Sequence, residues 1–196
     1  MLFIWIMLLI FVSFQLITKY DSSHGLKLGT GTWAAAAAIA LAASVLIRRR
    51  EYLALPVMLY GVLAAYLVTA SITDRQTKMV HDFLHLAGGL AGVALLIYRW
   101  PGQEVFREAV IFIGLQMLLF RKLYGTADCL VFSVCALYLA AEGKDLMTYL
   151  LHMSATFLLL AVVQACRKNI NRKGNLKEPV ALVPYIAATL GIFIMM

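Results

Sequence analysis

Two aspartates lie where polar sequence meets apolar sequence. Asp74 follows the apolar stretch AAYLVTASIT, and Asp128 precedes the apolar stretch CLVFSVCAL. Two carboxylates a few ångströms apart cannot both ionise, so they share one proton. The ionised member could take a proton from water while the protonated member donates to a carbonyl oxygen under attack. Such a pair would hydrolyse a peptide bond without a metal or a covalent intermediate.

The residues before Asp128 suit an extended substrate. Gly125, Thr126 and Ala127 are small, so a peptide backbone could approach Asp128 closely. Asp82 lies near the start of the next apolar segment, where a helix cap is its ordinary role and contact with the substrate is the alternative. We predict these four residues as the substrate-binding set, with Asp74 and Asp128 as the catalytic pair.

The composition indicates an integral membrane protein. Hydrophobic residues make up 63% of the 196 residues and charged residues 14%, whereas soluble domains carry about 25% charged residues. The longest polar stretch, 167–179, is too short for a separate soluble domain. The three cysteines are too few and scattered for a disulfide framework or a four-cysteine zinc site, so no metal or cofactor is expected. We predict one integral membrane domain over 1–196.

Eight apolar segments predict an all-α, polytopic helical bundle. About 20 residues are needed for each membrane crossing, so two short segments, 106–121 and 127–141, leave the count at six to eight. The first segment lacks a basic start and a small-residue cleavage site, and it is expected to remain as a membrane span. The segments are 1–18, 30–47, 53–72, 83–99, 106–121, 127–141, 146–166 and 180–196.

The order of the segments puts the two acids on one side of the membrane. Asp74 closes the third segment, Asp128 opens the sixth, and two crossings separate them. With the N-terminus outside, eleven of the seventeen lysines and arginines lie inside, which the positive-inside rule favours, although Arg48–Arg50 lie outside. That orientation predicts a multi-pass protein with both acids facing the cytoplasm. The net charge of +7 fits contact with the lipid bilayer and gives no reason to invoke nucleic acid.

The segments around the two acids resemble motifs of the type IV prepilin peptidases, membrane aspartic peptidases that include the preflagellin peptidases. That family carries its first aspartate in D-x-R-x-x-x-I-P-N, similar to DRQTKMVHD at 74–82. It carries its second in G-x-G-D, similar to GTAD at 125–128. VPYIAATLG at 183–191 resembles the family's late segment with proline and an aromatic residue. The resemblance covers about 60–196, the expected peptidase-like core.

The chain also departs from the family pattern. His81 stands where the family has proline, Gln76 where it has arginine, and Leu130 where it often has lysine. Val80 and Asp82 resemble the isoleucine and asparagine of the first motif. These departures leave open a non-catalytic relative. A small transporter that uses its acids for cation or proton binding is the other alternative.

The resemblance implies an activity and a partner. It implies that Asp74 and Asp128 cut the leader from prepilin-like proteins, which carry a basic leader and an apolar helix. Cleavage would occur at the cytoplasmic face of the cell (inner, cytoplasmic) membrane. The chain has no room for the family's cysteine-containing insertion, so we expect cleavage without methylation.

Helix dipoles and histidines give further expectations. Asp74 ends an apolar segment, where a negative charge opposes the helix dipole, so a capping role fits it poorly. His81 and His85 are four residues apart and are expected on an interfacial polar face rather than in a metal site. His152 lies inside the seventh segment and is expected to form an interhelical hydrogen bond.

Overall fold

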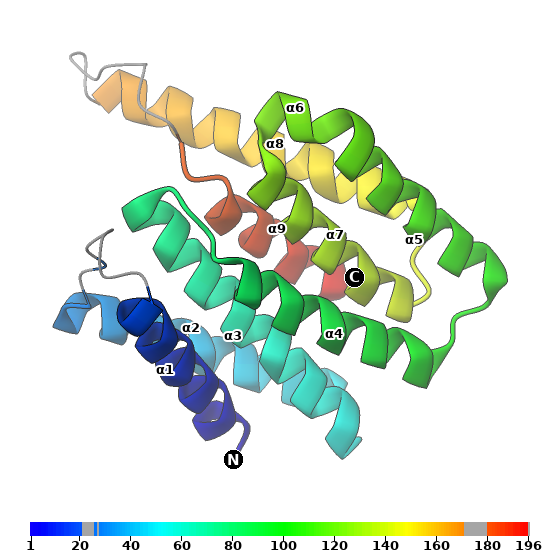
Figure 1. The fold of residues 1–196 in the computed structure, drawn as a ribbon, viewed down its shortest axis with the longest axis horizontal. Helices are drawn as coiled ribbons and strands as arrows, with labels where there is room; N and C mark the ends of the chain where they lie inside the picture. Colours follow the sequence, from blue (N-terminus) through cyan, green and yellow to red (C-terminus); the bar gives the residue numbers. More distant parts are fainter. Residues whose placement is uncertain (21–25, 27, 171–179, 196) are drawn as a thin grey trace.

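The computed structural model describes residues 1–20, 26, 28–170 and 180–195, and every regular element in these ranges is a helix (Figure 1). The predicted all-α class is therefore confirmed for the described residues. In chain order the helices are α1 (Leu2–Tyr20), α2 (Thr30–Arg50), α3 (Ala54–Thr77), α4 (Asp82–Arg99), α5 (Gln103–Leu115), the π-helix η2 (Gln116–Phe120), α6 (Arg121–Tyr124), α7 (Thr126–Ala141), α8 (Leu146–Ile170) and α9 (Val183–Met195).

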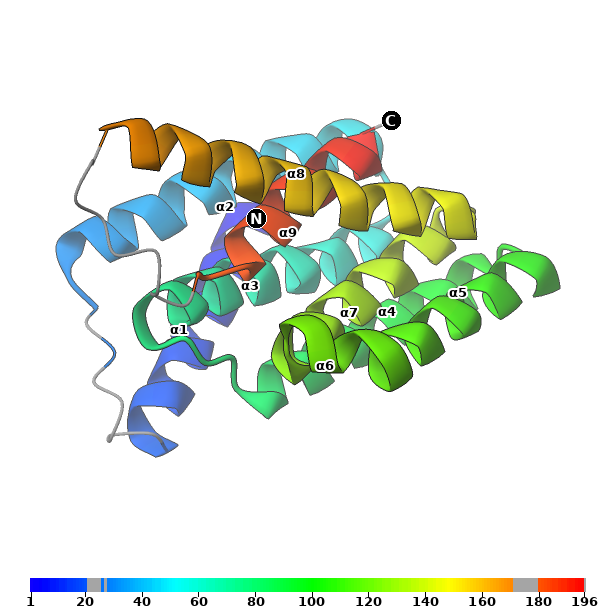
Figure 2. The ribbon, with the colours of Figure 1, turned by 90° about the horizontal axis from the view of Figure 1, so that it is seen from above.

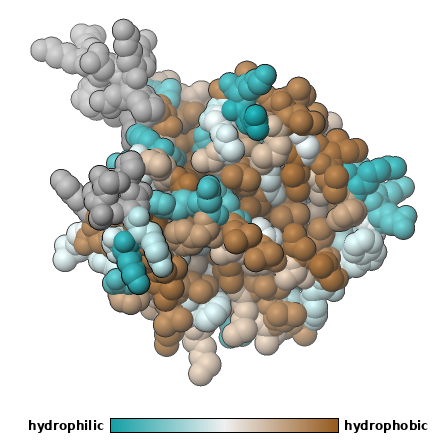
Figure 3. All heavy atoms as spheres, viewed as in Figure 1, coloured by the Kyte–Doolittle hydropathy of each residue, from teal (hydrophilic) through white to brown (hydrophobic). Residues whose placement is uncertain are grey.

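Five of the described helices are long and apolar enough to cross a membrane: α1, α2, α3, α4 and the 146–166 part of α8. Helices α7 and α9 are apolar but shorter. Hydrophobic side chains cover most of the face shown in Figure 3, and polar side chains gather toward its periphery. The molecule therefore has the surface of a membrane protein. The short fifth segment, 106–121, lies inside an uninterrupted helical run from Gln103 to Tyr124.

Helix α3 lies at the centre of the bundle. Helices α1, α2, α4 and α9 all pack against it, and α9 packs on its other side against α8 (Figures 1 and 2). Helix α7 packs against α4, α5 and α9. Successive long helices run in opposite directions, so the end of α3 and the starts of α7 and α9 lie toward the same end of the bundle (Figure 1).

Two glycines let α4 approach its neighbours closely. A Cβ atom at Gly88 would lie 3.0 Å from the ring of Tyr66 in α3, and one at Gly92 would lie 3.0 Å from the Cβ of Leu137 in α7. These separations are tighter than ordinary van der Waals contacts, so a larger side chain at either position would force its neighbour to move. Because α4 bridges α3 and α7, this close packing sets the separation of the helices that carry Asp74 and Asp128.

A network of charged side chains ties the opposite end of the bundle together. Glu142 follows α7 and accepts hydrogen bonds from Arg50 at 2.6 Å and from Arg99 and Tyr60. Arg99 also pairs with Glu51. The Glu142 side chain is only 6% exposed, and a buried carboxylate persists when it is paired and hydrogen-bonded in this way. This network joins the ends of α2, α3, α4 and α7.

Candidate active site

Asp74 lies in the last turns of α3 but is bonded to the start of α9. Its side chain is 8% exposed, and its Oδ2 accepts the backbone N–H of Val183 at 3.0 Å. The N–H of Leu182 is a second donor to the same carboxylate. Helix N-termini leave N–H groups free and carry a partial positive charge. Asp74 is therefore a cap for α9. The expectation that capping fits it poorly was wrong, because the dipole that matters belongs to another helix.

Asp128 lies in the first turn of α7, which begins after a glycine turn. Gly125 has φ 105° and ψ 156°, a conformation that other residues adopt only with strain. The carboxylate of Asp128 is half-buried, and a Cβ at Gly125 would meet only its Oδ2, at 3.9 Å. The N-terminal dipole of α7 favours a negative charge at this position. Open space thus lies beside the Asp128 carboxylate.

The structure brings Asp74 and Asp128 together. They are 54 positions apart in the chain, yet they lie near enough for the charge of Asp74 to act on the Asp128 carboxyl group. Lys78 is one turn beyond Asp74 and attracts its carboxylate. Lys78 adopts the left-handed conformation, φ 59°, that ends α3, and its N–H bonds the Asp74 carbonyl. Asp74 comes from the C-terminal end of α3 and Asp128 from the N-terminal end of α7. These two helix ends lie toward the same end of the bundle.

Three of the four predicted substrate-binding residues directly precede Asp128 in the chain, and Asp82 is the exception. Gly125 and Thr126 are exposed and Ala127 is half-buried, directly before the carboxylate. Asp82 is exposed in the first turn of α4. The N-cap of α4 is His81 and Asp82 is the first residue of the helix, so the expectation that Asp82 is the cap was wrong.

A second polar group lies in the interior near Asp128. Tyr66 is close enough to Asp128 for electrostatic interaction, and its hydroxyl lies 2.9 Å from Nδ1 of His85. His85 is 6% exposed, so its predicted place on an interfacial face was wrong. Its Nε2 and the hydroxyl of Thr69 are buried without a hydrogen-bond partner among the described residues. These groups give the apolar core a polar lining on the side of Asp128.

The π-helix η2 precedes the Asp128 turn and was not predicted. Its first residue, Gln116, is fully buried and accepts a hydrogen bond from the hydroxyl of Tyr124. Short π-helical segments inside helices are frequent at functional sites, because they shift the side chains that follow. The polar Gln116 within an apolar run was the available sequence signal. Its bond to Tyr124 fixes the end of α6 immediately before Gly125.

His152 forms the interhelical hydrogen bond that the sequence predicted. Its Nε2 lies 3.2 Å from the carbonyl of Ile186, so it joins α8 to α9. In the described ranges no three His, Cys, Asp or Glu side chains gather as a metal ion would require.

The distance between the polar layers is short for a membrane. Asp74 is fourteen residues from Tyr60 along α3, and Asp128 is fourteen residues from Glu142 along α7. At 1.5 Å per residue each separation is about 21 Å, whereas the hydrocarbon core of a bilayer is about 30 Å thick. The acid pair and the Glu142 network thus lie closer together than the two surfaces of an undisturbed bilayer.

The fold and the site define a class: an all-helical protein with apolar, membrane-length helices and an aspartate pair at one end of the bundle. No protein-family model matches the chain, and no curated protein or solved structure matches it. The function is therefore inferred from the geometry of the site and from the short motifs at 74–82 and 125–128.

Proposed function

We propose that this chain is an aspartic endopeptidase that removes the leader peptide of prepilin-like membrane proteins. The observation that carries the proposal is that Asp74 and Asp128 lie toward the same end of the bundle, near enough for the charge of Asp74 to act on Asp128. Ionisable residues inside apolar helices are costly and mark functional sites by default. The exposed Gly125–Thr126 turn supports it too, since an extended peptide can approach Asp128 there.

In the proposed reaction the two acids have different roles. Hydrogen bonds from Val183 and Leu182 stabilise the carboxylate form of Asp74, so Asp128 carries the shared proton. Asp74 takes one proton from water as the water oxygen attacks the scissile carbonyl carbon, and Asp128 donates its proton to the carbonyl oxygen. The C–N bond then breaks, the amine leaves with the proton from Asp74, and the re-formed carbonyl returns a proton to Asp128.

We also propose the arrangement in the cell membrane. The bundle crosses the bilayer eight times with its N-terminus outside, and the acid pair faces the cytoplasm. The apolar helix of the substrate lies in the bilayer and its basic leader stays in the cytoplasm, so the scissile bond lies at the membrane boundary. The 21 Å separation of the polar layers supports this arrangement, because it favours a thinned bilayer and access of water to the boundary.

One observation favours a second candidate, a non-catalytic membrane protein. Asp74 holds the start of α9 through Val183, and that structural role would by itself explain a buried aspartate. The two candidates differ in what an asparagine would do. An asparagine at 74 still offers an oxygen to the N–H of Val183 but cannot exchange protons with water at neutral pH.

The test is cleavage of prepilin-like proteins from the same genome, co-expressed with the wild type, Asp74→Asn or Asp128→Asn. A matched control is Glu104→Gln, the same chemical change at an exposed acid in the first turn of α5. The proposal expects shortened substrate with the wild type and the control and none with either aspartate variant. Cleavage that survives Asp74→Asn or Asp128→Asn would exclude the pair mechanism. Folded wild type that cleaves no substrate would favour the non-catalytic candidate.

A further inference from the structure

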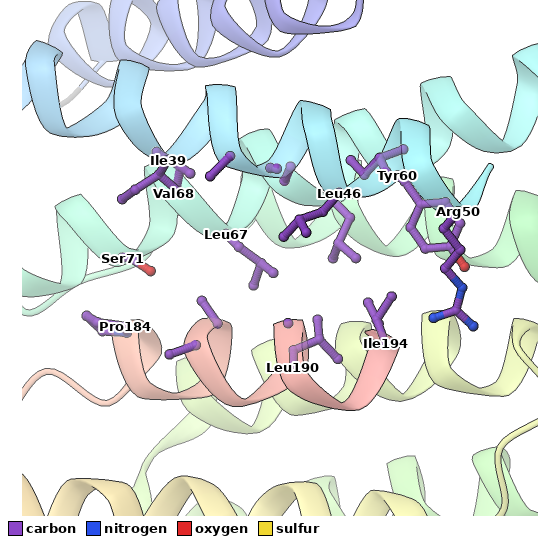
Figure 4. A pocket seen from close by; sticks show the side chains of 18 of the residues that line it. Ile39, Leu46, Arg50, Tyr60, Leu67, Val68, Ser71, Pro184, Leu190 and Ile194 are labelled. Atoms are coloured by element: carbon purple, nitrogen blue, oxygen red, sulfur yellow. The ribbon is translucent and has the colours of Figure 1, made fainter. Parts of the chain in front are cut away.

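An apolar groove runs along the outside of α3, between α2 and α9. Figure 4 shows the groove from close by. Its volume is about 740 Å³. Helices α2 and α9 both pack on α3, and they stand apart on either side of it. Leu67 and Val68 form part of the floor, and small side chains of α2 and α9 form much of the walls. A Cβ at Gly191 would meet no atom within 4 Å, so this wall faces open space.

The groove has one apolar end and one basic end. It begins near Ser71 and Pro184, close to the acid pair, and it ends at Arg50 (Figure 4). Arg49, the preceding residue, also lines it. From Ser71 to Tyr60 is eleven residues along α3, which is about 17 Å at 1.5 Å per residue. Half of a hydrocarbon core of about 30 Å is about 15 Å. The groove is thus about as long as one leaflet of an undisturbed bilayer, and it spans most of the roughly 21 Å between the acid pair and the Glu142 network.

The basic end has a cation that is free to bind a ligand. Arg50 is paired with Glu142, and Glu51 is paired with Arg99. Arg49 is exposed, lines the groove and has no acidic partner among the described residues. Arginine binds phosphate oxygens with two parallel hydrogen bonds and retains its charge near a membrane. An amphiphile with one anionic head therefore matches the groove in both length and charge.

We propose that this groove binds an anionic phospholipid of the bilayer, with one acyl chain along α3 and the phosphate on Arg49. A cavity of 740 Å³ lies in the range of about 300–1,000 Å³ typical of small-ligand sites. A membrane-spanning helix is less suited to it, because such a helix is about 30 Å long and the groove runs for only about 17 Å along α3.

Native mass spectrometry of the full chain in a mild detergent tests the proposal. Phosphatidylglycerol is titrated as the anionic probe and phosphatidylcholine as the zwitterionic one. We expect one tightly bound phosphatidylglycerol per chain. Arg49→Ala should weaken it about fivefold, the effect of one basic residue near a membrane surface. The matched control Arg48→Ala removes the same charge one residue earlier, outside this groove, and should change binding less than twofold.

Two further variants separate the head from the chain and guard against misfolding. Gly191→Leu fills open space in the groove, so it should displace the lipid without changing the charge. Arg49→Lys keeps the charge and should retain binding within about twofold if Arg49→Ala acts through the phosphate. Equal losses in Arg48→Ala and Arg49→Ala would overturn the proposal. So would equal binding of the two lipids, an unaffected Gly191→Leu variant, or a polypeptide retained in place of lipid.

Discussion

Replacing Asp74 by alanine and by asparagine separates its structural role from its chemical one. Alanine removes the acceptor for the N–H groups of Val183 and Leu182, which are 0% and 5% exposed as residues. A buried donor without a partner costs about 1–3 kcal/mol. Because the site lies at the end of the bundle, the low part of that range applies to each donor. We expect Asp74→Ala to lower the free energy of unfolding by about 2–4 kcal/mol.

Asparagine keeps one oxygen in the same place and loses only the charge. The favourable interaction of that charge with the α9 dipole is about 0.3–1 kcal/mol, so Asp74→Asn should cost about 1 kcal/mol or less. At roughly 2–4 °C per kcal/mol for a chain of this size, alanine should lower the melting temperature by roughly 4–16 °C. Asparagine should lower it by no more than about 4 °C.

The assay is thermal unfolding in detergent micelles followed by tryptophan fluorescence, with cleavage measured on the same preparations. Glu104→Ala is the stability control, because Glu104 is exposed and makes no cap bond. A stable Asp74→Asn variant without cleavage would support the proton-sharing role. If Asp74→Ala melts with the wild type, the bond to Val183 does not hold α9 and the reasoning is refuted. If the alanine and asparagine variants are equally unstable, the loss of charge outweighs the loss of the hydrogen bonds.

Three further perturbations test the packing and the charges. Gly92→Leu should destabilise by about 1–3 kcal/mol through overpacking against α7, whereas Gly89→Leu, whose Cβ meets nothing within 4 Å, should not; thermal unfolding compares them. Glu142→Ala should cost about 1–3 kcal/mol, because Arg50 and the Tyr60 hydroxyl lose their acceptor while Arg99 keeps its pairing with Glu51, and chemical unfolding measures it. The hydrogen bond from the Thr148 hydroxyl, and then that from its N–H, lowers the pKa of Asp145 at the start of α8. Because folding lowers this pKa, the ionised carboxylate stabilises the folded protein fully when the pH is above the unfolded pKa, about 3.9. That stabilisation is lost as the pH falls through the folded pKa. Melting temperatures should therefore fall below about pH 4 less steeply in Asp145→Asn than in the wild type.

The helices could be predicted because an apolar chain in a membrane must satisfy its backbone within each segment. The predicted run 53–72 corresponds to α3 and 83–99 to α4. The placement of Asp74 and Asp128 at one end of the bundle also follows from the sequence, because two predicted membrane crossings separate them. This result is the same for either orientation of the chain in the membrane. These predictions use only local composition and the order of segments along the chain.

What the sequence did not predict depends on partners far away along the chain. Asp74 is bonded to a residue 109 positions later, and dipole reasoning within one helix gave the wrong sign for it. The burial of His85 depends on Tyr66 in the neighbouring helix. The groove between α2 and α9 has no local pattern, because its walls come from segments more than 130 residues apart. Pro184 in the first turn of α9 was the one local sign of a helix start there.

The two acids are held by helix ends rather than by a rigid loop, and this explains how a carboxylate pair persists in so apolar a chain. The start of α9 supplies hydrogen-bond donors to Asp74, and the start of α7 supplies a favourable dipole to Asp128. Both helices are shorter than a full crossing, so their starts lie below the level that a 30 Å core would reach. Under the proposed function, water and substrate would therefore meet the pair in a thinned region of the bilayer. The short helices α7 and α9 thus set both the charge environment of the acids and the depth at which a bond could be cut.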